Sequence, residues 1–375
     1  MVVGIIGAGP AGCFLGSKLK WDDSVIFERK RENGIPVQCT GIVTGAAHKI
    51  LKDIPEEAIV SRIHSFRLRA PNLSFIDINL SKEDLILDRN AFDKYLAQKA
   101  SDSGAQIRFS HQLKGWNVKK SSDHITSHNP EGRYFRLAFS NGKSEDIDLI
   151  VGADGPYSAV ARIAGLSDAR DVLTGFQARV KTRNPAQNFE SGITEVLLGV
   201  GEFAWIVPES KSVARIGVVG SKGKERETAL EYRELISKYI VLEDQSGPIP
   251  LYDPGQRIQQ GAIALIGDAA GQVKATTYGG IIYGLNAAQM LGESWQWYDK
   301  RFRQEFGKEL WISLRMRKAM NKFSKEDYDS LVRIFSAEKN KRVLAGTDRN
   351  YPSAIALKLA LREPRLWKYG LKALL

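Results

Sequence analysis

Short apolar runs alternate with a helical pattern at the start of the chain. Val2 to Ile6 is an apolar run closed by glycine, Pro10 to Lys20 has a helical pattern, and Ser24 to Phe27 is a second apolar run. Short apolar runs bounded by glycine or polar residues are typical of buried strands. The opening therefore predicts a compact βαβ unit.

The same alternation continues in the next part of the chain. Apolar runs at Leu85 to Leu87, Ala105 to Phe109 and Ile147 to Val151 indicate strands, and Asn90 to Ser103 has a helical pattern. Strands that alternate with helices usually build a parallel sheet with helices on its faces. We therefore expect these runs to extend the sheet that the βαβ unit begins.

The pattern becomes β-rich between residues 169 and 257. One amphipathic helix is expected from Glu225 to Ile240, and strands are expected at Thr194 to Leu198, Phe203 to Val207 and Val213 to Val219. The α/β pattern resumes at Ala262 to Ile266, and the sequence is helical from Glu293 onward. This order predicts an α/β fold whose first domain is interrupted by an inserted β-rich domain and followed by helices.

The chain is long enough for two or three domains, since it has 375 residues of which 43% are hydrophobic. We place the discontinuous α/β domain, which carries the first βαβ unit, at residues 1–50, 84–168 and 258–295. The β-rich substrate domain is expected at 51–83 and 169–257, and the helical region at 296–375.

Composition narrows the classes of partner. The formal net charge is +11 and the pI is near 9.4, which favours phosphorylated small molecules or an anionic membrane surface. Nucleic acid is not expected, because no recognition motif accompanies the charge. Two cysteines, Cys13 and Cys39, argue against a disulfide framework, and neither a metal-ligand cluster nor a signal peptide is apparent. We expect a cytoplasmic protein, soluble or peripheral on the cytoplasmic membrane face.

The first candidate site is the glycine-rich loop after the first predicted strand. It comprises Gly7, Ala8, Gly9, Pro10, Ala11 and Gly12, and the next strand ends at Glu28, followed by Arg29. Glycines permit a tight turn and close approach to a pyrophosphate, and an acidic residue at this spacing can accept from ribose hydroxyls. The pattern predicts dinucleotide binding without separating FAD from NAD.

Three later segments resemble those of FAD-dependent flavoproteins of the aromatic-hydroxylase type. Gly267 and Asp268 follow an apolar strand, as in the second FAD fingerprint of these proteins. Asp154 and Gly155 resemble their shared Asp-Gly motif, and Arg89 stands in a segment like their arginine segment. Each segment alone could be an ordinary turn, but their order is that of the superfamily. The resemblance implies FAD as the cofactor and a Rossmann-like FAD-binding domain of the glutathione-reductase type.

Three further segments resemble the geranylgeranyl reductase family within that superfamily. They are Pro36 to Gly41, with a Pro-x-x-Cys-x-Gly pattern, Phe203 to Pro208, with an aromatic-x-Trp-x-x-Pro pattern, and Thr277 to Ile281. Phe203, Val207 and Tyr278 depart from the family's usual tyrosine, phenylalanine and glycine. The likeness extends to the helical tail at Arg362 to Arg365.

This resemblance implies an FAD-dependent reductase that saturates C=C bonds of geranylgeranyl chains on membrane lipid precursors, with hydride from reduced flavin. It implies Cys39, or alternatively Tyr278, as proton donor and Phe203, Trp205 and Pro208 as substrate-binding residues. The implied cofactor-binding residues are Gly7, Gly9, Pro10, Ala11, Gly12, Glu28, Arg29, Cys39, Gly41, Arg89, Asp154, Gly155, Gly267, Asp268, Gly279, Gly280 and Ile281. The electron donor is left open between NAD(P)H and a ferredoxin.

Other interpretations stay open at this point. A flavin monooxygenase shares the first motifs, although hydroxylases usually place His and Pro after the aspartate and this chain has no histidine after His128. A peripheral flavin-binding protein without this catalysis is the alternative of another class. Cys39 can also be an inert packed thiol, and Trp205 an ordinary core residue.

The last segment has a basic stripe beside an apolar stripe. The basic residues are Lys358, Arg362, Arg365, Lys368 and Lys372, and the apolar residues are Leu357, Leu361, Trp367, Leu371 and Leu374. A pair of helices interrupted at Pro364 could lie on an anionic membrane with this pattern. The alternative is a helix pair that packs on its own domain with a solvated basic face.

Overall fold

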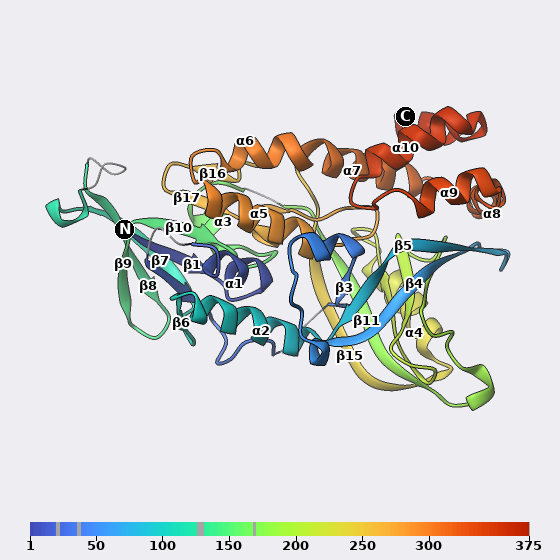
Figure 1. Ribbon diagram of the computed structural model, residues 1–375, viewed down its shortest axis with the longest axis horizontal. Helices are drawn as coiled ribbons and strands as arrows, with labels where there is room; N and C mark the ends of the chain where they lie inside the picture. The colour runs from blue at the N-terminus through green and yellow to red at the C-terminus, as the bar shows by residue number, and fades with distance from the viewer. Residues whose placement is uncertain (20–22, 36–38, 126–130, 168–169, 375) are drawn as a thin grey trace.

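The parallel sheet predicted from the opening βαβ unit is present. The computed structural model describes residues 1–19, 23–35, 39–125, 131–167 and 170–374. Its six-stranded sheet has the order β16-β17-β10-β1-β2-β6, with β16 antiparallel to β17 and the other neighbours parallel. The strands are β1 (Val2–Ile6), β2 (Asp23–Phe27), β6 (Gln106–Arg108), β10 (Leu149–Gly152), β16 (Gln259–Gln260) and β17 (Ile263–Leu265). The sheet and its helices form the left half of the molecule in Figure 1.

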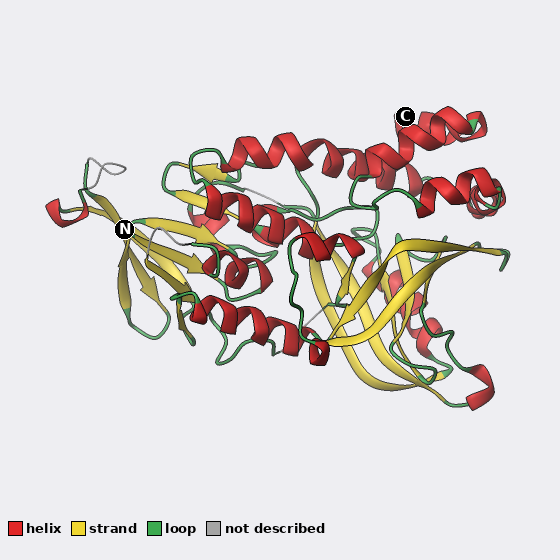
Figure 2. Cartoon of the chain, in the orientation of Figure 1, coloured by secondary structure: helices red, strands yellow, loops and turns green. Residues whose placement is uncertain are grey.

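A second sheet of eight strands forms the right half of the molecule (Figure 2). Its order is β15-β11-β14-β13-β12-β4-β5-β3, and only the β12–β4 pair is parallel. The strands are β3 (Ile42–Val43), β4 (Ile59–Arg69), β5 (Phe75–Leu87), β11 (Val172–Thr182), β12 (Ile193–Leu197), β13 (Phe203–Pro208), β14 (Val213–Val219) and β15 (Tyr239–Pro250). The predicted β-rich region therefore forms one sheet together with earlier segments of the chain.

A small sheet that the sequence pattern did not predict follows β6. It consists of β7 (Leu113–Lys120), β8 (Arg133–Phe139) and β9 (Ser144–Ile147), all antiparallel. The strand predicted at Ile147 to Val151 is present as β10 of the parallel sheet, but its predicted start is wrong, because Ile147 ends β9 and Leu149 begins β10. Asp148 separates the two strands, and its carboxylate accepts a hydrogen bond of 2.7 Å from the backbone N–H of Val2.

The helices cover both sheets. They are α1 (Pro10–Gly16), α2 (Arg89–Asp102), α3 (Ala159–Ile163), α4 (Glu225–Ile236), α5 (Ile281–Glu293), α6 (Tyr298–Phe302), α7 (Lys308–Met320), α8 (Lys325–Phe335), α9 (Glu338–Ala345), α10 (Pro352–Arg362) and α11 (Trp367–Leu374). Helix α1 packs against α2 and α5 beside the parallel sheet, and α8 and α9 pack against β5. The C-terminal helices lie above the eight-stranded sheet in Figure 1.

Three other predicted elements also differ from the structure. The first helix ends at Gly16, where a Cβ atom would lie 2.8 Å from Ile26 Cδ1 of the adjoining strand. The helix expected up to Ile240 ends at Ile236, because Tyr239 begins the long strand β15. The run Leu85 to Leu87 does not extend the parallel sheet but ends β5, which pairs with β4 in the other sheet.

Each face of the eight-stranded sheet packs a different apolar cluster, as the alternation of side chains along a strand requires. One face packs Ala178, Ile216 and Val218 against α4. The other face carries Leu173, Trp205 and Val219 with the aromatic rings of Phe203 and Tyr278. The predicted fold class is confirmed, and the domain boundaries stay a prediction.

Candidate active site

The first glycine loop packs tightly against the loop after β10. Gly7 has φ +108°, and a Cβ atom there would lie 2.3 Å from the carbonyl oxygen of Ala153. A Cβ atom on Gly12 would lie 2.1 Å from the carbonyl oxygen of Gly7. Gly9 differs, because a Cβ atom there would meet nothing within 4 Å. Gly7 and Gly12 thus allow close packing, whereas Gly9 leaves open space at the start of the helix. The predicted cofactor contacts of this loop, which continues into Pro10 and Ala11, stay a prediction.

Glu28 at the end of β2 lies under this loop. Its buried carboxylate accepts hydrogen bonds from the backbone N–H groups of Ala8 at 2.8 Å and Lys30 at 2.9 Å. The neighbouring Arg29 is exposed. The structure therefore brings Glu28 to the glycine loop, and its contact with a ribose stays a prediction.

Asp154 caps a helix with its carboxylate. It accepts from Ser158 Oγ at 2.5 Å and from the backbone N–H groups of Ala159 and Val160 at 2.7 and 3.2 Å, at the start of α3. Burial raises its pKa, while these hydrogen bonds oppose that shift. Gly155 follows with φ +81° and open space at its Cβ position. Asp154 thus has a structural partner, and its predicted contact with the cofactor stays untested.

The loop at Asp268 lies against both α1 and α5. A Cβ atom on Gly267 would lie 3.2 Å from Ala11 Cβ, and one on Gly280 would lie 2.9 Å from Asp268 Oδ1. Burial raises the pKa of Asp268, and the charges of Arg89 and Arg170 oppose this. Within the part of the chain that the structure describes, no group donates a hydrogen bond to the Asp268 carboxylate. It is therefore available to accept one from a cofactor hydroxyl.

Arg170 fixes this loop and was missed by the sequence interpretation. Its guanidinium donates to the backbone carbonyls of Asp268 and Ala269 at 2.8 and 2.7 Å, and to that of Pro156 at 3.4 Å. Burial lowers its pKa, opposed by the charges of Asp154 and Asp268. Arg170 belongs to no recognisable sequence motif, so its role could not be predicted from the sequence and is identified only by the fold.

Arg89 connects the arginine segment to the Cys39 loop. It donates to Asp93 at 2.9 and 3.0 Å from the first turn of α2. Burial disfavours its charge, but Asp93 and the Cys39 sulfur raise its pKa above the ordinary value. Arg89 therefore lies near both Cys39 and Asp268, and the predicted roles of these residues at a cofactor stay untested.

The Cys39 loop lies on the face of the eight-stranded sheet that carries Trp205, opposite the face that packs on α4. Cys39 is half-buried, its backbone N–H donates to Gln245 Oε1 at 3.2 Å, and its sulfur accepts from the Gly41 N–H at 3.3 Å. Gly41 has φ +78°, and a Cβ atom there would lie 2.5 Å from the carbonyl oxygen of Leu87. Residues 36–38 of the predicted motif lie outside the described residues.

The predicted substrate residues Phe203 and Trp205 share a cluster with Tyr278. The ring centroids of Phe203 and Trp205 are 5.6 Å apart, and those of Phe203 and Tyr278 are 6.3 Å apart. Trp205 is buried, and its indole N–H donates to Gln177 Oε1 at 3.2 Å. Pro208 ends β13, and its carbonyl accepts from Ser61. A buried apolar cluster rich in aromatic rings thus adjoins the Cys39 loop.

Tyr278 has a backbone conformation that favours glycine. Its φ is +53°, which costs a residue with a side chain about 1–2 kcal/mol. Its hydroxyl donates to the Glu202 carboxylate, and its pKa is raised by burial, opposed by the charge of Arg317. Arg317 lies 5.3 Å from the ring and donates to the carbonyls of Ala275 and Thr276 at 3.1 and 2.6 Å. Gly279 and Gly280 follow, and α5 begins at Ile281.

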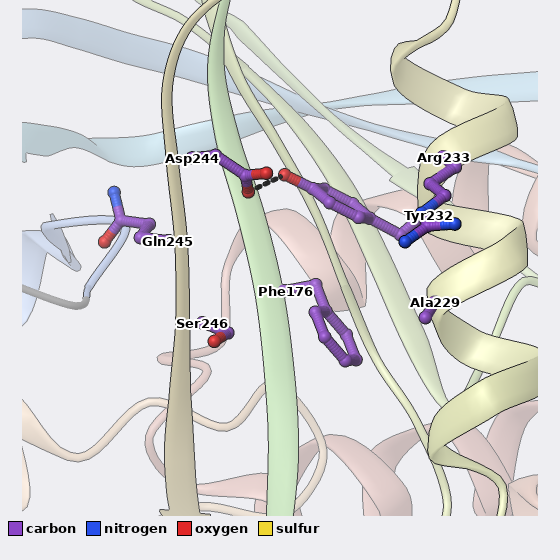
Figure 3. Close-up of a pocket in the computed structure, with 7 residues that line it drawn as sticks. All are labelled: Phe176, Ala229, Tyr232, Arg233, Asp244, Gln245 and Ser246. Carbon is purple, nitrogen blue, oxygen red and sulfur yellow. Dashed lines mark hydrogen bonds between the residues drawn. The ribbon is translucent and has the colours of Figure 1, made fainter.

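A separate concavity of about 340 Å³ lies between the sheet and α4 (Figure 3). Tyr232 donates to Asp244 there at 2.5 Å, and Phe176 stacks on Tyr232. This is the face of the sheet opposite Trp205, because successive residues of a strand point to opposite sides. The concavity contains none of the predicted site residues, and the described residues include no group of three His, Cys, Asp or Glu side chains suited to a metal ion.

The fold and these loops define a flavoprotein with a dinucleotide-binding domain, in the class of FAD-dependent oxidoreductases. The chain belongs to the FAD binding domain family, whose model matches residues 1–240. Over 98% of its length it is 27% identical to digeranylgeranylglycerophospholipid reductase 2 of Methanopyrus kandleri, 97% of which is covered.

Two solved structures describe the likeness in fold. A geranylgeranyl bacteriochlorophyll reductase-like protein from Thermoplasma acidophilum has a TM-score of 0.82 at 21% identity, with 98% of each chain covered. The p-nitrophenol 4-monooxygenase from Pseudomonas putida has a TM-score of 0.62 at 15% identity, with 96% of this chain and 97% of that one covered. These comparisons confirm the resemblance to the geranylgeranyl reductase family, while the fold itself is shared with monooxygenases.

Proposed function

We propose that the protein is an FAD-dependent reductase that saturates the C=C bonds of geranylgeranyl chains on precursors of membrane lipids. One observation supports this most directly: Trp205 and Thr40 donate hydrogen bonds to the same oxygen of Gln177. An aromatic, apolar cluster therefore lies directly beside the loop that carries Cys39. An isoprenoid chain offers no polar group to orient it, so it needs apolar contacts of this kind and must be positioned by shape.

The residues present fit FAD. Gly9 leaves space at the start of α1, Glu28 lies under that loop, and the Asp268 carboxylate is free to accept a hydrogen bond. In this proposal the first loop holds the pyrophosphate, and Asp268 and the segment Gly279 to Ile281 hold the flavin end. Reduced FAD, when bound, supplies the hydride for alkene reduction.

Cys39 is the proposed proton donor. Its S–H bond breaks and the proton forms a new C–H bond on the alkene carbon that does not receive hydride. The sulfur then carries the negative charge, which the Gly41 N–H and the Arg89 guanidinium stabilise. Water reprotonates the thiolate. Tyr278 is the weaker candidate, since its hydroxyl donates to Glu202 and burial raises its pKa.

Anaerobic turnover of a geranylgeranyl lipid tests this function. Chemically reduced protein should add one pair of hydrogen atoms to each reduced double bond, as measured by lipid mass spectrometry. Chemical reduction makes the result independent of whether NAD(P)H or a ferredoxin is the electron donor. Oxygen incorporation into an aromatic substrate with unchanged lipid would instead establish a monooxygenase. Bound FAD with neither reaction would indicate a flavin-binding protein without this catalysis.

We also propose that the C-terminal helices lie on an anionic membrane surface. Leu357, Leu361 and Trp367 are 62, 75 and 62% exposed, and Lys358 and Arg362 adjoin them. Apolar side chains beside basic ones are typical of helices that bind the interface of anionic bilayers. The side chains of Leu371, Lys372 and Leu374 lie outside the described residues. No helix in the described part of the chain is long and apolar enough to span a membrane.

A further inference from the structure

Four neighbouring strands each contribute one residue to a row across the eight-stranded sheet, on the face that carries Trp205. Gln177 of β11 pairs in register with Gln245 of β15 and with Gly217 of β14, and Gly217 pairs with Trp205 of β13. A Cβ atom on Gly217 would lie 2.2 Å from Trp205 Cζ2. The indole therefore lies over Gly217, and only glycine lets it reach Gln177.

This row holds the Cys39 loop at two points. Gln245 Oε1 accepts the backbone N–H of Cys39 at 3.2 Å, and Gln177 Oε1 accepts the Thr40 hydroxyl at 2.5 Å. Arg215 of β14 also donates to the Thr40 carbonyl. In Figure 3 the side chain of Gln245 points away from Tyr232 and Asp244, which line the other face of the sheet. Three strands thus fix two successive residues of the loop.

The orientation of the Gln177 amide is determined by Trp205. The indole N–H can only donate, so the reversed amide would place an NH₂ group against it, whereas the Thr40 hydroxyl could pair with either orientation. Gln177 is 5% exposed, and within the described residues its Nε2 has no hydrogen-bond partner. A buried amide with an unpaired N–H is destabilising, so packing alone does not explain a glutamine at this position.

We propose that Gln177, together with Gln245, is a positioning residue that fixes the Cys39 thiol relative to the Trp205 indole. Gln177 Oε1 accepts hydrogen bonds from both Trp205 and Thr40. A molecule that displaces the indole therefore also changes the hydrogen bond between Gln177 and Thr40 that holds the loop. Gln177 acts through Cys39 and does not itself take part in proton transfer. The value of this arrangement for catalysis rests on the proposed function, whereas the placement of the thiol can be measured without it.

Alkylation of Cys39 by iodoacetamide in the folded protein measures that placement. Cys13, the other cysteine, is fully buried with its pKa raised to about 12, so the reagent reports Cys39. Gln177→Met and Thr40→Val should each increase the labelling rate by about tenfold, as expected for one lost hydrogen bond. Thr40→Ser, which keeps the hydroxyl, should label at the wild-type rate. Gln98→Met, at an exposed glutamine of α2, is the matched control.

A double-mutant cycle tests the shared oxygen. Trp205→Phe and Thr40→Val should be non-additive in the labelling rate, and the non-additivity should disappear in a Gln177→Met background. Reductase assays of Gln177→Met should show a lower kcat with a KM near that of the wild type. Wild-type labelling of Gln177→Met with unchanged melting temperature, or strict additivity in the cycle, would overturn the proposal. If labelling responds as expected while wild-type protein reduces no lipid, the positioning stands and the proposed function fails.

Discussion

Asp268 lies against Gly280, where a Cβ atom would be 2.9 Å from the Asp268 carboxylate oxygen Oδ1. The glycine therefore lets the turn before α5 approach a half-buried carboxylate to which no described residue donates. Arg170 holds the backbone of the same loop through the carbonyls of Asp268 and Ala269. Hydrogen bonds thus hold the backbone of the loop in place, while the Asp268 carboxylate remains available as an acceptor. This combination suits the loop to bind a cofactor that carries hydroxyl groups.

Asp268→Ala should weaken FAD binding by about 1–3 kcal/mol, because a buried cofactor hydroxyl would lose its acceptor. Fluorescence titration of the apoprotein with FAD measures the change. Asp154→Ala is the comparison, since Asp154 caps α3 and its loss should lower the melting temperature of the apoprotein. Unchanged FAD affinity in Asp268→Ala would show that this carboxylate does not hold the cofactor.

Cys39→Ser should slow alkene reduction by about 10²-fold or more, the range for a lost general acid, with FAD content unchanged. Tyr278→Phe should have the smaller effect, because its hydroxyl is engaged with Glu202. The measurement is single-turnover reoxidation of reduced protein by lipid under anaerobic conditions. A wild-type rate for the cysteine variant, with a slow tyrosine variant, would transfer the role to Tyr278.

Lys274 should make stability increase with pH above neutrality. Burial and, to a smaller extent, the charge of Arg349 together lower its pKa to about 7, while its ammonium donates to the Arg349 carbonyl at 2.9 Å. Between pH 7 and the ordinary pKa of 10.5, the unfolded chain holds a proton here that the folded chain does not. The free energy of unfolding should therefore rise by up to about 1.4 kcal/mol per pH unit from this group.

Urea unfolding of wild type and Lys274→Met at pH 7 and pH 9 checks this. The free energy of unfolding of wild type should increase relative to that of the variant as the pH rises. Lys322→Met, at an exposed lysine, controls for the removal of a charge. A difference between wild type and Lys274→Met that does not change with pH contradicts the shifted pKa.

Leu361→Glu should reduce binding to anionic lipid vesicles by about tenfold or more, since it removes a side chain that is 75% exposed and able to enter the bilayer interface. Sedimentation with vesicles that contain phosphatidylglycerol measures the change. Val118→Glu replaces another exposed apolar residue, on β7, and should bind as the wild type does. Equal binding by both variants would favour helices that pack on their own domain.

The sequence by itself determined the parts of the site that depend on local backbone requirements. Gly7 and Gly267 have φ values of +108° and +63°, which favour glycine whatever the rest of the chain does. The spacing from Gly7 to Glu28 likewise follows from one strand, one helix and the next strand. Such constraints operate over a few residues, so a reader of the sequence can locate the glycine loops and the carboxylates beside them.

Tertiary structure alone decided which distant segments share a sheet and a hydrogen bond. Leu85 to Leu87 reads as a strand, but its pairing with β4 and β3 depends on partners elsewhere in the chain. Gln177 and Thr40 are 137 positions apart, and Arg170 and Asp268 are 98 apart. Polar side chains of this kind have no periodicity or motif, because their partners are chosen by the register of the sheet and by the packing of the two halves of the molecule.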